Sequence, residues 1–143
     1  MKPTAVLLLL TAAALSAPGG AAEDAPDYVG RARCAACHAE QNARWTGSHH
    51  GLAMQTADEG SVLGRFDGAT FDWFGVRSRF YRRDGRFMIT TDGPDGRMQD
   101  YEIKYTFGVF PLQQYLIEFP GGRLQALDIA WDSRPPEAGG QRW

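Results

Sequence analysis

The sequence predicts an α+β protein, in which a short helical segment precedes an antiparallel β meander of five to six strands. A stretch rich in alanine in the first half of the chain favours helix. From Ala69 onward the apolar residues recur with a period of two, which is typical of half-buried strands. Gly, Pro and Asp residues separate these later apolar runs at short intervals, as they do in a series of hairpins. At 143 residues the chain has room for one ordinary domain.

Residues 1–22 have the pattern of a secretory signal peptide. Lys2 supplies a positive charge, Val6–Leu15 is an apolar stretch too short to cross a bilayer, and small residues up to Ala22 provide a cleavage site. We therefore expect export to a bacterial periplasm and no membrane span in the mature chain. The net charge is −2 and the arginines are spread along the chain, so the basic footprint of a nucleic-acid-binding protein is absent from the sequence.

The next segment, residues 23–64, is predicted to carry the helix. Frequent alanines predict one helix from Arg33 to Trp45, and Gly47 is expected to end it. The stretch 49–64 is ambiguous, with a short helix over 52–57 followed by a loop.

Residues 65–133 are predicted to form the β-rich unit. Asp84-Gly85 predicts a two-residue hairpin turn, and longer turns are expected at 92–96 and 120–122. A change of phase near Ala126 predicts a bulge in the last strand. The tail, residues 134–143, is expected to be irregular. The predicted strands are Arg79–Arg83, Arg86–Thr91, Tyr101–Phe107, Tyr115–Phe119 and Leu124–Trp131.

Both cysteines and all three histidines fall within residues 34–50. Cys34, Cys37 and His38 form C-x-x-C-H, which is the pattern of covalent haem attachment. Two intervening residues let the two thiols reach the two vinyl groups of one porphyrin, and the next residue can offer its imidazole to the iron. We therefore expect one haem c, held by thioether bonds to Cys34 and Cys37, with His38 as the proximal ligand of the iron.

Two other interpretations of the cysteine pair remain open. Zinc could be bound by Cys34 and Cys37 together with one or both of His49 and His50, since thiolate and imidazole are common zinc ligands. That site would leave His38 without a role. An exported C-x-x-C pair could also be a disulfide or a thiol-redox site. A thioredoxin-like protein would show a βαβ pattern around the pair, and this sequence does not.

The second axial ligand of the haem iron is a geometric question. His50 follows His38 by twelve residues, which is about 18 Å along one continuous helix. Two imidazole nitrogens on one iron lie only about 4 Å apart. Either the chain folds back after Gly47, or His50 or His49 serves a different haem. Met54 is another candidate, which would give His/Met ligation, unless it is a core methionine.

Three motifs near the start of the predicted mature chain form an array: Tyr28-Val29-Gly30, Cys34-x-x-Cys37-His38 and Trp45-x-x-Ser48-x-His50. This array resembles the opening of multihaem cytochromes c of the cytochrome c-552/c-554 type, which include relatives of hydroxylamine oxidoreductase and of tetrahaem cytochromes. The β-rich segment 101–135 looks like an insert found in one exported branch of that group. The resemblance implies that His38 binds the iron of its own haem, that His50 binds the iron of a neighbouring haem, and that Trp45 packs near the porphyrin; His49 matches no position.

This sequence departs from the multihaem pattern because it contains a single C-x-x-C-H motif and the given sequence ends at Trp143. We expect that it is the N-terminal piece of a longer multihaem chain, or that a separate redox protein docks against it. The expected function is electron transfer, because no separate acid–base constellation indicates an enzyme in its own right. The alternatives are the haem-bearing part of an oxidoreductase acting on a small nitrogen or sulfur compound, and a zinc-binding interaction domain.

Overall fold

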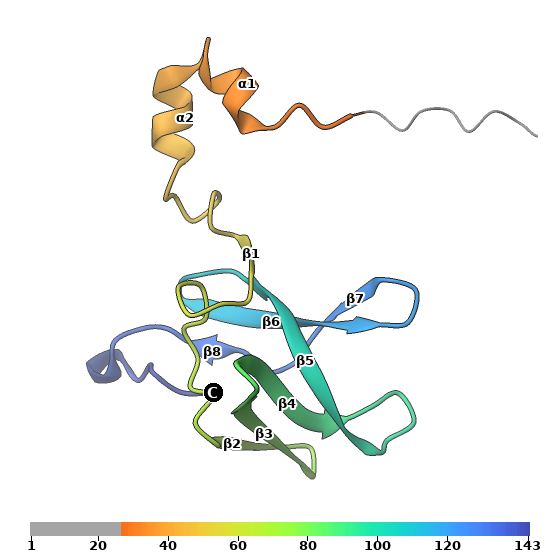
Figure 1. The fold of residues 1–143 in the computed structure, drawn as a ribbon. Helices are drawn as coiled ribbons and strands as arrows, with labels where there is room; N and C mark the ends of the chain where they lie inside the picture. Colours follow the sequence, from red (N-terminus) through yellow and green to blue (C-terminus); the bar gives the residue numbers. More distant parts are fainter. Residues whose placement is uncertain (1–26) are drawn as a thin grey trace, which may run out of the picture.

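The computed structural model describes residues 27–143, so the predicted signal peptide lies outside the described residues (Figure 1). Two short helices come first and a mostly antiparallel β structure follows, which confirms the predicted class at that level. The elements are α1 (Arg31–Ala35), α2 (Ala39–Trp45), β1 (Met54–Thr56), β2 (Thr70–Trp73), β3 (Val76–Arg83), β4 (Arg86–Asp92), β5 (Met98–Phe107), β6 (Leu112–Phe119), β7 (Arg123–Ala126), β8 (Trp131–Asp132) and the 3-10 helix η1 (Pro136–Ala138).

Strands β2 to β7 pair in chain order, each antiparallel to the next, so the predicted meander is confirmed. The strands are more numerous than the five or six expected, because β1 also pairs with β5 and β8 also pairs with β6. In the stretch that the sequence left ambiguous, the short helix considered over 52–57 does not form, and residues 54–56 are strand β1. Met54 lies opposite Phe107 in the β1–β5 ladder, and pairing with an existing strand satisfies backbone groups that a one-turn helix would leave open.

The predicted hairpin turn is confirmed at Asp84-Gly85. Arg83 and Arg86 are paired residues, and the two residues between them have φ angles of 51° and 76°. Positive φ at both central positions is the mark of a type I′ turn, whose twist matches the twist of the flanking strands. The β3–β4 hairpin therefore has the tight two-residue turn that its sequence predicts.

The last predicted strand is wrong in detail. Residues 124–131 do not form one bulged strand; β7 ends at Ala126, and β8 begins at Trp131. The change of phase near Ala126 marks this break, because Leu127 and Ile129 are both buried in the intervening segment. The register shift instead lies in β5, between Ile103 and Tyr105. A bulge bends a strand, so β5 can pair with β4 in its first half and with β6 in its second.

Phe66, in the connection between β1 and β2, lies at the centre of the core. Its ring makes edge-to-face contacts with Phe80, Phe87 and Tyr115 at centroid distances of 5.6, 5.0 and 5.4 Å. Phe80 and Tyr115 are fully buried. Offset and edge-to-face geometries are the favourable arrangements for aromatic rings. Residues from both halves of the sheet thus enclose one aromatic core.

The tail after β8 contains more order than the irregular segment predicted. Asp132 and Arg142 form a β-bridge, and η1 ends at Ala138 and is followed by Gly139, which has a φ of 77°. Trp143 then stacks on Phe80, with ring centroids 3.5 Å apart and an interplanar angle of 7°. The tail therefore contributes an aromatic ring to the core.

Candidate functional site

The cysteine motif lies on a pair of helices that differs from the single helix predicted. The prediction of one helix from Arg33 to Trp45 is wrong, because the chain leaves helical geometry at His38, which has φ −119° and ψ 47°. Cys34 belongs to α1, Cys37 lies on the connecting turn, and His38 is the N-cap residue of α2. The predicted end is right, since α2 finishes at Trp45 and Gly47 has a φ of 75°.

A cleft of about 400 Å³ lies between α1 and α2. Cys34 and His38 both line it, whereas Cys37 does not and is exposed on the turn. On α2, the residues that line the cleft follow His38 at helical spacing, so they share one face. The lining residues are Arg31, Cys34, His38, Gln41, Asn42 and Trp45.

Arg31 connects the two helices across this cleft. It donates a hydrogen bond to the Thr46 hydroxyl, which in turn donates to the Asn42 carbonyl at 2.7 Å. The Arg31 guanidinium also lies 5.4 Å from the centre of the Trp45 ring, within cation–π range. Among the described residues, the side-chain oxygen of Asn42 has no hydrogen-bond partner, although it is shielded from solvent. The cleft thus has a cationic, an aromatic and an amide side chain around Cys34 and His38.

The two helices have no core of their own. Within residues 27–143, neither helix contains a buried residue and neither packs against a strand, so the helical pair stands apart from the sheet (Figure 1). Trp45 is 47% exposed and Tyr28 is 96% exposed. Helices of five and seven residues are not stable in water without packing partners. Within the described residues, each helix of the pair therefore has only the other helix to pack against.

The other two histidines lie beyond the far end of α2. His49 faces the β unit, with its ring 6.2 Å from the ring of Phe110. His50 is the next residue, in the turn that leads to β1, and it does not line the cleft that holds His38. Met54 is placed in β1 and is 49% exposed, so it is not a core methionine. The structure thus brings Cys34, His38 and Trp45 together and leaves His49, His50 and Met54 apart from them.

The described structure adds no geometric support to the zinc and disulfide interpretations of the cysteine pair. In the part of the chain that the structure describes, no three His, Cys, Asp or Glu side chains come together as a metal site. Cys34 and Cys37 are free thiols there.

Of the described helices, none is long and apolar enough to cross a membrane.

Sequence reasoning missed Arg31 and Asn42 as parts of the site. Asn42 follows His38 by one helical turn, so a projection of the helix from His38 would have placed it beside the motif histidine. Arg31 had no comparable signal.

Comparisons with protein families, with curated proteins and with solved structures found no match for this chain.

Proposed function

We propose that this protein carries one covalent haem c on the helical pair and transfers electrons in the periplasm. The observation that carries the proposal is the placement of Cys34 and His38 on one cleft, within a C-x-x-C-H motif. Each thiol would add across one vinyl group, so that sulfur bonds to one vinyl carbon and the thiol hydrogen passes to the other. The haem would supply the one-electron chemistry of its iron.

The side chains around the cleft suit a porphyrin. Trp45 offers an aromatic ring that is 47% exposed. His38 offers an imidazole to the iron, and Arg31 is a positive charge that can pair with a propionate. A bound porphyrin would also give α1 and α2 the apolar surface against which to pack. These residues would hold and orient the group, and the protein around it would exclude water and so set the reduction potential.

We also propose that a neighbouring haem module binds next to His50, either from a longer version of this chain or from a docking redox protein. Large apolar side chains are exposed at this end of the β unit, which we call the apolar end. Phe110 contacts His49, and the Gly108 amide donates to the Ala53 carbonyl at 2.7 Å, so the apolar end adjoins the histidine turn. Its exposed residues are Met54, Phe107, Phe110 and Leu112, at 49%, 49%, 53% and 52%.

Covalent attachment can be tested by intact-mass spectrometry of protein exported from cells that mature c-type cytochromes. Under denaturing conditions we expect the mass of the processed chain plus one haem. Exchange of both Cys34 and Cys37 for Ser should restore the mass of the bare chain, whereas Ser48→Ala, a matched polar control in the nearby turn, should keep the added haem. A bare chain in the unaltered protein would contradict the proposal.

A further inference from the structure

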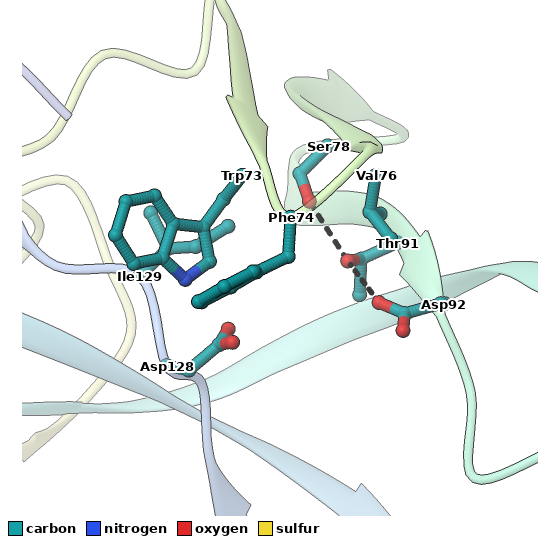
Figure 2. Close-up of a pocket in the computed structure, with 8 residues that line it drawn as sticks. All are labelled: Trp73, Phe74, Val76, Ser78, Thr91, Asp92, Asp128 and Ile129. Atoms are coloured by element: carbon teal, nitrogen blue, oxygen red, sulfur yellow. Dashed lines mark hydrogen bonds between the residues drawn. The ribbon is translucent and has the colours of Figure 1, made fainter. Parts of the chain in front are cut away.

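A second pocket lies at the other end of the β unit, away from the helical pair. It is formed by the tip of the β2–β3 hairpin, the end of β4 and the segment between β7 and β8 (Figure 2). Two aromatic rings, Trp73 and Phe74, and two carboxylates, Asp92 and Asp128, line it together with Val76 and Ile129. Its volume is about 70 Å³, far below the roughly 300–1,000 Å³ of sites for drug-sized ligands. It can take one small head group and not a porphyrin.

Phe74 is at a position that folding alone does not explain. It has a φ of 46° and is followed by Gly75 with a φ of 81°, so the two form a two-residue turn of type I′ between Trp73 and Val76. This turn favours Gly, which has no Cβ, and Asn or Asp, whose short polar side chains tolerate positive φ, whereas a bulky aromatic side chain is strained there. The Phe74 side chain is 89% exposed, so it gains almost nothing from burial. A phenylalanine here stabilises neither the turn nor the core.

The Trp73 and Phe74 rings form an ordered pair at the pocket. Their centroids are 4.7 Å apart at an angle of 72°, an edge-to-face contact. Phe71 stacks on Trp73 from the core side at 6.3 Å, and this contact anchors the indole. The hairpin thus presents an aromatic surface whose inner end is fixed by the core.

Hydrogen bonds fix one of the two carboxylates. The Ser78 and Thr91 hydroxyls are buried and 2.8 Å apart, and the Thr91 hydroxyl donates to Asp92 Oδ1 at 3.2 Å. Because a hydroxyl donates one hydrogen, Ser78 donates to Thr91 and Thr91 donates to Asp92. Figure 2 shows this chain along one side of the pocket, with the Asp128 carboxylate reaching toward the Phe74 ring from the other side.

The charges of the pocket have one sign. No Lys, Arg or His lines it, and within residues 27–143 neither Asp92 nor Asp128 forms an ion pair. Two neighbouring grooves share Asp92 with this pocket and contain arginines. In one, the Arg123 guanidinium lies over the Phe119 ring at 5.1 Å. In the other, Arg77 pairs with Asp72 at 2.8 Å and the Arg79 guanidinium lies 5.0 Å from the centre of the Tyr81 ring. Two uncompensated carboxylates beside two aromatic rings attract a cation by charge-assisted hydrogen bonds and by cation–π contact.

We propose that this pocket binds the head group of an organic cation, an alkylated ammonium or a guanidinium. Phe74 and Trp73 would contact the cation through their rings, and Asp92 and Asp128 would balance its charge. The same chemistry is found in a free quaternary ammonium compound and in a Lys or Arg side chain of a partner protein. This site is separate from the helical pair and does not depend on the haem proposal.

The test is an NMR titration of the full exported chain, labelled with ¹⁵N, with tetramethylammonium chloride at constant ionic strength. We expect saturable shifts of the Trp73 indole N–H and of the Gly75 and Asp128 amides. Asp128→Asn should weaken binding about ten-fold, as expected when one of the two carboxylates no longer attracts the cation. Glu118→Gln, which changes an exposed carboxylate on β6 outside the pocket, should leave the affinity unchanged.

Phe74→Asn separates binding from folding. Asparagine is favoured in a type I′ turn, so this variant should fold with a higher melting temperature and bind tetramethylammonium about five-fold more weakly. If Phe74→Asn binds tetramethylammonium as tightly as the unaltered protein, the role of Phe74 is overturned. If Asp128→Asn binds it as tightly as the unaltered protein, the role of the Asp128 carboxylate is overturned.

Two further probes decide the source of the cation. Tighter binding of tetramethylammonium than of N-acetyl-lysine or N-acetyl-arginine methylamide supports a free quaternary ammonium ligand. The reverse order supports a side chain of a partner protein. Equal binding of tert-butanol, a neutral molecule of similar shape, or no saturable shift with any of the three cations, would overturn the proposal.

Discussion

His38 and His50 lie at opposite ends of helix α2. His38 is the N-cap residue, and His50 follows the C-terminal end after a short turn. The seven residues of α2 rise about 10 Å, whereas two imidazole nitrogens on one iron are separated by about 4 Å. The break at His38 shortens the helix expected from the sequence but keeps the two histidines apart. In the haem-bearing protein, they are therefore expected to serve different irons.

This separation predicts how histidine variants of the isolated holoprotein behave. His50→Ala should leave the visible spectrum unchanged, because His50 is not expected to bind the iron of this chain's own haem. His38→Ala should change the spectrum, because it removes the proximal ligand. His49→Ala is the matched control in the same turn and should also have no effect. A shift from a low-spin to a high-spin spectrum in His50→Ala would show that the chain folds back onto its own haem.

The absence of a core in the described helical pair predicts that it depends on haem for order. Hydrogen exchange should be fast at the Asn42 and Thr46 amides in the haem-free chain, although they bond to the His38 and Asn42 carbonyls at 2.9 and 3.0 Å. In the holoprotein these amides should become protected. The amide of Ile89, a fully buried residue in the centre of the sheet, is the internal control and should be protected in both forms. Equal protection of α2 in both forms would contradict the prediction.

Trp143 should contribute strongly to the stability of the β unit. Its ring contacts Phe66, Phe80, Tyr115 and Trp131 at centroid distances of 5.5, 3.5, 5.5 and 5.3 Å. Trp143→Ala would leave a cavity beside these rings and should lower the free energy of unfolding by about 3 kcal/mol.

Urea unfolding measures this loss, with Trp73→Ala as the control. Trp73 is 49% exposed, so its replacement should cost less than about 1 kcal/mol. If the two variants are equally stable, the contacts of Trp143 do not stabilise the core.

Tyr115 should make the protein sensitive to alkali. Burial raises the pKa of its phenol above the ordinary value, although the amides of Gly64 and Leu63 act in the opposite direction. Above the unfolded pKa of about 10, the unfolded chain releases a proton that the folded chain keeps. The contribution of Tyr115 is therefore complete below pH 10 and is lost as the pH rises further.

The urea midpoint measured from pH 8 to 11 tests this linkage. Tyr115→Phe should be less stable at pH 8 by about 1–2 kcal/mol, because the phenol donates to Gln113 at 2.7 Å and accepts from Gly64 at 2.9 Å. Its midpoint should then fall less steeply above pH 10. Tyr28→Phe, at a side chain 96% exposed, should keep the slope of the unaltered protein. Parallel slopes for all three proteins would rule out Tyr115 as the cause.

Local patterns predicted the parts of the fold that local chemistry determines. Asp84-Gly85 specifies its own turn, and the alternation of apolar and polar residues marked β3 to β6 because one face of each strand is buried. The predicted strands did not include β1, β2 and β8, because these strands are three, four and two residues long and owe their form to a partner strand. A pairing of Met54 with Phe107 leaves no local signal.

The candidate site shows the same division. The spacing of Cys34, Cys37 and His38 can be found in the sequence because the proposed covalent attachment of haem requires that spacing. The break between α1 and α2 has no Gly or Pro to announce it. The contact of Arg31 with Trp45 and the position of Phe110 beside His49 arise from tertiary folding, so they required the structure.

The alkaline pyridine haemochrome spectrum tests the central proposal most directly. It is measured on protein matured by the c-type haem machinery, with the Cys34→Ser, Cys37→Ser double variant as the control. We predict the absorption band of a haem with both vinyl groups converted to thioethers, in a ratio of one haem to one chain, and no band in the double variant. The absence of a haem band from the unaltered protein, with zinc found by elemental analysis, would contradict covalent haem binding.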